Sequence, residues 1–399
     1  MRVTQASDQT QFLSTLDTLE SNIAQTQNQV STGLAFTTPS QNPSAAGEVD
    51  NFQQVLAQSQ QYTANANAAQ TGLNTEDTAL TQVQTQLQSL RDLALEANSG
   101  TASNQNLGAI ATQAQQIQAS LLSLANTQDG NGNYIFAGFA SQTQPFALTA
   151  TGASYAGDQG QPQVQIAAGQ TVASGDSGDA VFNQIKTGNG TFTVTANAAN
   201  TGSGLIGATT VSNPTLYTGG SYSINFTAAN TYQVVNSATN AVVTTGTYAS
   251  GTAIAFDGLQ VSLSGQPATG DSFAVNPSTN QSVFTTVQTL VSALQAGVST
   301  PASQTQFSNT IAGTLNSLDQ ALTHSSTVQA AVGGRLNAIT TQLSVATSQQ
   351  AQLTQSISSL QGLNYATAIT TLDSQNTTLS AAMQAYTLTQ GLTLFKYIQ

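Results

Sequence analysis

The chain of 399 residues contains no cysteine, no tryptophan and a single histidine, His324. Without thiols or a second imidazole it has no disulfide, no thiolate or paired-histidine metal site and no cysteine nucleophile. His324 follows an apolar helical segment, and no Gly-x-Ser-x-Gly elbow accompanies it, so a catalytic triad is not expected. No phosphate-binding loop ending in Gly-Lys occurs either. We therefore expect no enzymatic activity, with no catalytic residue, no cofactor and no metal site.

Charge is also scarce, because charged residues make up 6% of the chain where about 25% is usual. The 17 acidic and 5 basic residues give a net charge of -12, which disfavours binding to nucleic acid or to anionic lipid. No stretch approaches the roughly 18 apolar residues of a membrane span. The first residues lack the apolar run of a signal peptide. We expect a protein that binds no nucleic acid, does not insert into membranes and carries no cleavable signal peptide.

The N-terminal part has an apolar seam with the 4-3 spacing of a helix, closed by Thr32-Gly33. The seam consists of Phe12, Leu16, Leu19, Ile23 and Val30, with Thr26 in phase. The next segment contains Pro39 and Pro43, which exclude a helix interior. We predict a turn there, with Asn42 as the N-cap and Pro43 as the first residue of the next helix.

That next helix is predicted to be long, because apolar residues recur at 3-4 spacing from Phe52 to Ala97, with Ser59 and Glu76 as polar exceptions. A further helix carries its seam from Leu107 to Leu124. The C-terminal part has comparable seams over 283–294, over 307–322 and, after Gly333-Gly334, over 336–360. Gly362-Leu363-Asn364 then breaks the phase before a last helix. Its seam and closing segment contain Ile369, Leu372, Leu379, Met383, Tyr386, Leu392, Leu394 and Phe395.

The middle of the chain predicts an antiparallel sheet, because apolar and polar residues alternate with a period of two. The alternating segments are 192–194, 222–226, 232–234, 254–256 and 261–263. Asn189-Gly190 and Asp257-Gly258 are hairpin-type turn signals. We expect one inserted β domain, a sandwich or small barrel. Asp176 and Asp179 flank Ser177-Gly178 without EF-hand spacing, which predicts a solvated loop.

The two terminal seams raise the question of what covers them. A helix with one apolar seam is stable in water only when that seam meets a partner. The terminal helices could pair with each other, but a two-helix hairpin leaves its outer sides thinly covered, so contacts between copies are the simplest completion. A surface of Gln, Ser, Thr and Ala adds little charge repulsion between copies. The alternative is that these seams are ordinary bundle cores within a monomer.

Several motifs resemble the flagellin superfamily, and within it the type 3 hook-associated proteins. They are the opening Met1 to Thr4, the stretch from Val30 to Ala46, the segment Gly132-Asn133-Tyr134-Ile135-Phe136-Ala137-Gly138, the turn from Tyr155 to Gly160, the stretch Val332 to Asn337 and the closing Leu392 to Ile398. The segment 132–138 is the most specific of them. Superfamily members often carry Arg where Ala35 stands and paired Asp where Gln41 and Asn42 stand. We hypothesise that a contact ion pair is replaced here by neutral packing and amide hydrogen bonds.

The resemblance implies a mainly α-helical, flagellin-like rod with an inserted β domain. Residues 1–36 and 363–399 would form an inner coiled coil, 37–141 and 281–362 a middle helical bundle, and 142–280 an outer antiparallel β domain. Pro39, Asn42 and Pro43 would form the turn between the inner and middle layers. Gly132, Tyr134, Ile135, Phe136 and Gly138 would either cap the bundle or contact a neighbouring subunit, and both readings stay open.

The resemblance also implies a function, namely a structural subunit that joins the flagellar hook to the flagellin filament outside the cell. Its partners would be copies of itself in a ring, the type 1 hook-associated protein, flagellin and an export chaperone. Export by the flagellar type III route would fit the missing signal peptide. Two alternatives remain at this point, namely a minor flagellin of the filament and a secreted adhesin that binds through the β domain.

Overall fold

The computed structural model describes residues 2–99 and 103–391. These residues form two compact units, one from residues 2–64 and 342–391 and one from residues 65–99 and 103–341. The helices are α1 (Arg2–Thr32), α2 (Pro43–Ala97), α3 (Asn104–Ala125), α4 (Val283–Ala296), α5 (Pro301–Gln361) and α6 (Tyr365–Gly391). The architecture is mainly α-helical with an inserted antiparallel β region, which confirms the predicted fold class.

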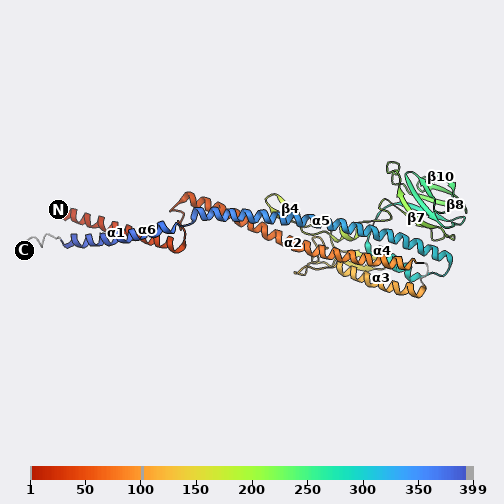
Figure 1. The fold of residues 1–399 in the computed structure, drawn as a ribbon, viewed down its shortest axis with the longest axis horizontal. Coiled ribbons are helices and arrows are strands. Elements are labelled where there is room, and N and C mark those ends of the chain that lie inside the picture. The colour runs from red at the N-terminus through yellow and green to blue at the C-terminus, as the bar shows by residue number, and fades with distance from the viewer. Residues whose placement is uncertain (1, 100–102, 392–399) are drawn as a thin grey trace, which may run out of the picture. The chain divides into compact units, whose positions relative to one another are not determined.

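The first unit is built on the terminal helices α1 and α6, which lie side by side (Figure 1). They are antiparallel, because Phe12 faces Tyr386, Thr26 bonds Gln375 and Ala35 bonds Gln361, so residue numbers rise on one helix as they fall on the other. Thr26 donates its hydroxyl to Oε1 of Gln375 at 3.0 Å. A polar pair thus sits on the otherwise apolar seam.

Two breaks in the helices meet in this unit. Leu34 and Gly362 form an isolated antiparallel bridge. The Ala35 amide donates to the Gln361 carbonyl at 2.8 Å, and the Leu363 amide donates to the Gly33 carbonyl at 2.9 Å. Gly33 has φ of +73°, which a side chain would strain. Backbone hydrogen bonds therefore connect the segment that follows α1 to the segment between α5 and α6.

The second unit contains a helical core from α2, α3, α4 and α5. The α2 seam is buried from Ala66 to Ala97, Glu76 included, whereas Val55 in its first part is 41% exposed. On α5 both Val332 and Ile339 are fully buried. The expected separation at Gly333-Gly334 is wrong, since α5 runs unbroken through both glycines. Each glycine costs an exposed helix about 1 kcal/mol relative to Ala. Burial of the residues that flank the two glycines offsets that cost.

Two short hairpins and one pair of strands distant in sequence connect the helices to the β domain. They are β1 (Phe146–Thr149) with β2 (Gly152–Tyr155), β3 (Gln163–Ala167) with β4 (Gln170–Ala173), and β5 (Ile185–Lys186) with β14 (Asn280–Gln281). The π-helical turn η1 (Asp179–Asn183) precedes β5. Phe146, Phe182 and Phe284 pack ring to ring, with centroids 5.3 to 6.1 Å apart. The segment 146–186 therefore shares an aromatic core with α4.

The remaining strands form two antiparallel sheets. One has the order β10-β9-β8-β13-β6 and the other β11-β12-β7. Their bounds are β6 (Phe192–Ala196), β7 (Leu205–Val211), β8 (Tyr222–Ala228), β9 (Thr231–Asn236), β10 (Val242–Thr247), β11 (Ala253–Phe256), β12 (Leu259–Ser264) and β13 (Ser272–Pro277).

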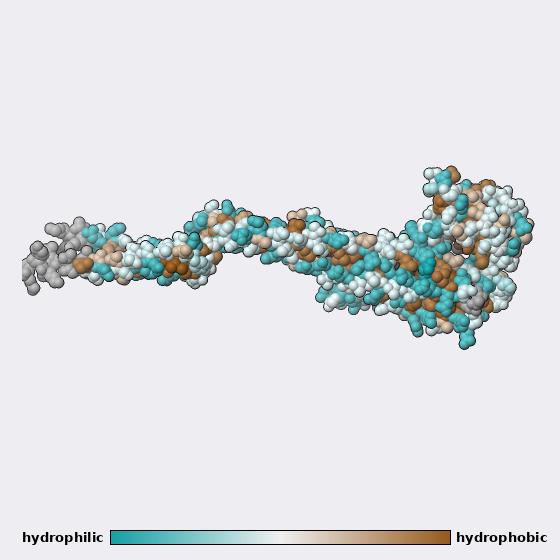
Figure 2. Space-filling view, viewed as in Figure 1, coloured by the Kyte–Doolittle hydropathy of each residue, from teal (hydrophilic) through white to brown (hydrophobic). Residues whose placement is uncertain are grey.

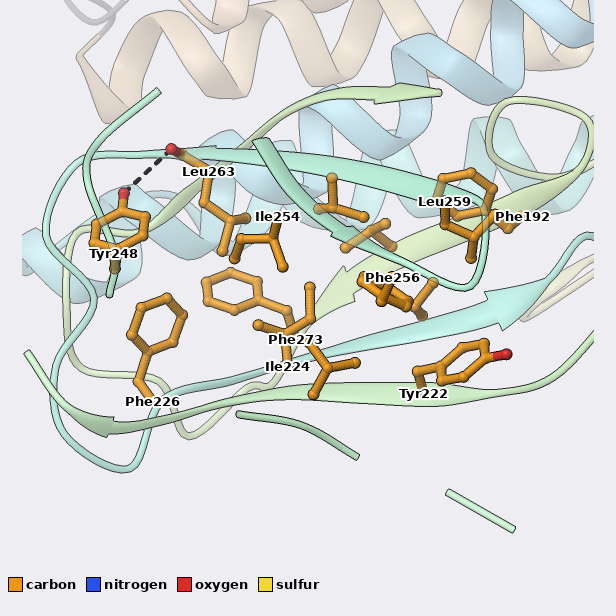
Figure 3. Close-up of a cluster of buried hydrophobic side chains, with 14 residues drawn as sticks. Phe192, Tyr222, Ile224, Phe226, Tyr248, Ile254, Phe256, Leu259, Leu263 and Phe273 are labelled. Atoms are coloured by element: carbon orange, nitrogen blue, oxygen red, sulfur yellow. Dashed lines mark hydrogen bonds between the residues drawn. The ribbon is translucent and has the colours of Figure 1, made fainter. Parts of the chain in front are cut away.

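Side chains from both sheets meet in one core, where Phe226 and Phe273 lie close to Ile254 and Leu263 (Figure 3). The Tyr248 hydroxyl donates to the Leu263 carbonyl at 3.2 Å and satisfies the polar end of that ring. Asp257 and Gly258 have φ of +39° and +78° and join β11 to β12 in the predicted hairpin. Asn189-Gly190 makes a turn, but β5 and β6 do not pair, so it closes no hairpin.

Candidate assembly surface and junction segment

The predicted terminal seams lie against each other. On α1, Ile23 is buried and Phe12, Leu16, Leu19 and Val30 are half-buried. On α6, Leu372, Leu379 and Tyr386 are half-buried. The sequence argument favoured partners in other copies. The structure instead provides part of the cover within the chain, because the breaks at Gly33 and Gly362 place α6 along α1.

Three large apolar residues of α6 remain exposed. Ile369 is 48% exposed, Met383 49% and Leu388 70%. Asp373 is the only charged residue from Tyr365 to Gly391, and Figure 2 shows hydrophilic, intermediate and apolar residues mixed over the region of the α1–α6 pair. Ile369 and Met383 lie about 40° apart around the helix axis, whereas Leu388 lies on another side. We call Ile369 and Met383 the outer face of α6. The predicted residues Leu392, Leu394 and Phe395 lie outside the described residues.

The predicted turn is built by local hydrogen bonds. Oδ1 of Asn42 accepts from the Ala45 amide at 3.2 Å, and Pro43 is the first residue of α2, so the predicted cap is present. Oε1 of Gln41 accepts from the Thr37 amide at 2.8 Å. Pro39 lies exposed within the turn. Phe36 packs beneath it with Ala46 and Val49. Neutral amides therefore hold this turn.

The segment Gly132 to Gly138, which we call the junction segment, follows α3. The Tyr134 amide donates to the Ser141 carbonyl at 2.8 Å, and the Ile135 amide donates to the Thr127 carbonyl at 3.0 Å. Tyr134 and Ile135 are half-buried. Phe136 is fully buried and meets Phe182 edge to face, with ring centroids 5.2 Å apart. Phe136 therefore belongs to the core, whereas its two neighbours reach the surface.

Asp129 and Asp158 shape the ends of this segment. Oδ1 of Asp129 accepts from the amides of Asn131 and Asn133, and the Asn133 amide chiefly lowers the pKa of Asp129. Asp158 accepts from the amides of Phe139 and Gly160, which lower the pKa of that carboxyl. Phe139, just beyond the segment, is 68% exposed. Two ionised carboxylates thus fix the backbone on either side of an exposed aromatic ring.

A second group of ionisable residues lies near the junction segment. The sequence analysis did not predict it. Asp176 is 8% exposed and forms a two-pronged ion pair with Arg335, with distances of 3.0 and 2.9 Å. The predicted solvated loop at Asp176 is therefore wrong. Glu76 is 1% exposed, and desolvation followed by the charge of Asp176 raises its pKa to about 8. The sequence signals were Glu76 on an apolar seam and Arg335 on a helix poor in charge.

His324 makes a structural contact, with Nε2 2.7 Å from the Ala180 carbonyl. Within residues 2–99 and 103–391, no group of three or more His, Asp or Glu side chains is arranged to hold a metal ion. None of the described helices combines the length and hydropathy that a membrane crossing requires. The notable features are thus exposed apolar helix faces and buried packing.

Comparison with known proteins gives two family matches. Residues 3–141 match the bacterial flagellin N-terminal helical region, and residues 195–277 match the D2-like domain of flagellar hook-associated protein 1. The crystal structure of Xanthomonas campestris FlgL is 35% identical, with a TM-score of 0.73, and the match covers 77% of this chain and 99% of that one. The chain belongs to the flagellar hook-associated protein 3 (FlgL) family.

Two further relatives agree. The flagellar junction protein FlgL from Legionella pneumophila is 30% identical with a TM-score of 0.68, over 74% of this chain and 99% of that one. Flagellar hook-associated protein 3 of Escherichia coli (strain K12) is 36% identical over 157 residues, 39% of this chain. The match spans about half, 49%, of that curated relative. Membership in this family confirms the resemblance that the sequence motifs indicated. It also confirms that the chain is a structural flagellar protein rather than an enzyme.

Proposed function

We propose that this chain is a structural subunit of the extracellular flagellum that joins the hook to the filament. The observation that carries the proposal is the antiparallel α1–α6 pair, in which α6 exposes Ile369 and Met383 and has one charged residue from Tyr365 to Gly391. Exposed apolar patches of this kind mark interaction sites in soluble proteins. The relative from Legionella pneumophila is named a flagellar junction protein, which supports the same role here.

The partners that we propose are copies of this chain in a ring, the type 1 hook-associated protein, flagellin and an export chaperone. The α1–α6 pair would bury its remaining apolar surface against equivalent helices of neighbours. Each buried apolar Å² contributes about 25 cal/mol, and few charged side chains on α6 need to be desolvated. The pairing within one chain would orient both terminal helices so that they enter the assembly together.

The outer face of α6 can be tested without disturbing the pair. In the Ile369→Gln/Met383→Gln variant, both changes lie on exposed positions, so the monomer should keep its circular dichroism spectrum and melting temperature. The source bacterium, with its chromosomal copy replaced by the variant, should lose filaments from its hooks. Electron microscopy of detached flagella and a swimming assay measure this.

The matched control is Thr371→Gln/Thr378→Gln, two exposed positions on the same helix that lie outside the apolar face. We expect this control to keep normal filaments. If the Ile369 and Met383 variant assembles as the control does, the outer face of α6 is not the assembly contact and the proposal fails. A filament-bearing cell that loses only attachment to surfaces would instead favour the adhesin alternative.

A further inference from the structure

The buried ionisable residues form a cluster between three parts of the second unit. Glu76 comes from α2, Asp176 from the segment 174–178 and Arg335 from α5. Nε2 of Gln161 also donates to Oδ1 of Asp176 at 2.6 Å. Asp176 therefore accepts three hydrogen bonds. By contrast, no described residue lies within ordinary hydrogen-bond geometry of either carboxyl oxygen of Glu76.

Segment 174–178 connects this cluster to the junction segment. On the helix side, a Cβ added at Gly72 would lie 3.3 Å from the Ser174 carbonyl oxygen, so the segment packs directly on α2. On the other side, the Gly178 amide donates to the Phe136 carbonyl at 2.7 Å. The segment thus bridges the helices and the backbone of Phe136.

A cavity of about 300 Å³ borders Glu76. Gly72, Ile135 and Gly175 are among the residues that line it, together with Tyr134 and Ser174. Asp129 lines it as well, but its carboxylate is held by Asn131 and Asn133. Glu76 lines this space, but its two carboxyl oxygens are themselves buried.

The charges explain why Glu76 must be neutral in the closed arrangement. Asp176 and Arg335 neutralise each other, so an ionised Glu76 would leave one buried negative charge without a partner. Such a charge is costly unless it is paired or hydrated. A protonated Glu76 can donate its proton towards Asp176, whereas an ionised one repels it. The other charged neighbour on α2, Asp77, accepts from Gln329 on α5.

We propose that Glu76 is a proton-controlled latch, which holds segment 174–178 and the junction segment against α2 and α5 while its carboxyl is protonated. Loss of the proton releases segment 174–178, exposes the Glu76 carboxyl to water and frees Tyr134 and Ile135 from their packed position. The latch acts within one chain and does not depend on the proposed role in assembly.

The direction of the pH response follows from the raised pKa of Glu76, which is about 8 in the folded chain and 4.5 in a solvated reference. The closed state binds the proton more tightly than the open state, so closure is fully favoured below about pH 4.5. It weakens as the pH rises towards about 8 and then levels off. The latch therefore opens on the alkaline side of neutrality.

The protonation of Glu76 can be measured directly, because the chain contains only four glutamates, at 20, 48, 76 and 96. In the full chain labelled with 13C at the glutamate carboxyl carbon, one of four resonances should titrate above neutral pH. That resonance should disappear in Glu76→Gln. If all four resonances titrate below pH 6 in the unmodified chain, the proposal is overturned, whatever the variant does.

Opening is measured by amide hydrogen exchange between pH 6.5 and pH 9, corrected for the intrinsic pH dependence of exchange. Amides of 174–178 and 134–136 should exchange at least roughly tenfold faster at the higher pH in the unmodified chain. Glu76→Gln should abolish this acceleration. Asp92→Asn, which removes one exposed carboxylate from the same helix, should retain it. Equal acceleration in Glu76→Gln would overturn the latch.

Discussion

The ring of Phe12 stacks on the ring of Tyr386, with centroids 4.9 Å apart and planes inclined by 8°. Nε2 of Gln9 donates to the Tyr386 hydroxyl at 3.3 Å, one helical turn away on α1. Both rings are half-buried. This contact joins opposite ends of the sequence and stabilises the part of the α1–α6 pair that is nearest to the chain termini.

Removal of this stacking should loosen the helix pair without unfolding the second unit. Phe12→Ala and Tyr386→Ala should each raise amide exchange along α1 and α6. A double-mutant cycle on the exchange free energies should give a coupling of roughly 0.5–1.5 kcal/mol. Leu13→Ala, on the 45% exposed neighbour of Phe12, is the control and should leave exchange unchanged. Additive single effects would mean that the rings do not support each other.

Gly138 and Gly132 offer a matched pair for the junction segment, because both have positive φ, +68° and +82°. A Cβ at Gly138 would lie 2.7 Å from the Asp158 carbonyl oxygen, whereas none of the described atoms lies within 4 Å of a Cβ at Gly132. Gly138→Ala should therefore destabilise by roughly 1–3 kcal/mol and Gly132→Ala by less. Urea unfolding followed by tyrosine fluorescence measures both. Equal losses would show that Asp158 moves aside without cost.

Much of the secondary structure could be predicted from local pattern. The helix seams follow the 3.6-residue period, and their polar exception Glu76 lies on the buried side. Alternation predicted the strands around Phe192, Ile224 and Phe256, because one face of each strand is buried. Strands β7, β10 and β13 of the two sheets escaped prediction. The partly exposed residues of β7 and β10 give no clear alternation, whereas β13 alternates and was missed.

The missed features depend on residues far apart in the sequence. The burial of Asp176 requires Arg335, which lies on α5, a helix that follows the whole β domain in the sequence. The α1–α6 pairing requires Gly33 and Gly362 to meet. The unbroken course of α5 through Gly333-Gly334 requires packing around Val332 and Ile339 to offset the weak helix propensity of glycine. Local propensity contains none of this information.

Low pH should loosen the start of the junction segment, where Asp129 accepts hydrogen bonds from the backbone. Because the pKa of Asp129 is lowered by the Asn133 amide, the stability it contributes is present above about pH 4 and is lost as the pH falls through the folded value. Amides of Asn131 and Asn133 should lose protection from exchange below pH 4. In Asp129→Ala they should be unprotected at neutral pH, while Asp92→Asn should behave as the unmodified chain. Protection that persists in Asp129→Ala would contradict this account.

The β domain should be separable at the β5–β14 pair. The Thr187 amide donates to the Thr279 carbonyl at 3.0 Å, and the Ser278 hydroxyl donates to the Thr187 carbonyl at 2.8 Å, so the entering and leaving chains lie side by side. Replacement of residues 188–277 by Asn-Gly should close this pair as a hairpin, with Asn, Gly and Ser278 as a three-residue loop between Thr187 and Thr279. Since the aromatic core of Phe146, Phe182 and Phe284 is retained, the variant should stay folded and helical by circular dichroism.

A wider deletion of residues 143–279 provides the comparison. It removes Phe146 and Phe182, both fully or nearly fully buried, and each loss of a buried phenylalanine costs roughly 3–5 kcal/mol. We expect this variant to melt at a lower temperature than the 188–277 replacement. Under the proposed junction role, the 188–277 replacement should still attach filaments to hooks, because α1 and α6 are intact. If filaments are lost although the melting temperature is kept, the β domain itself makes an assembly contact.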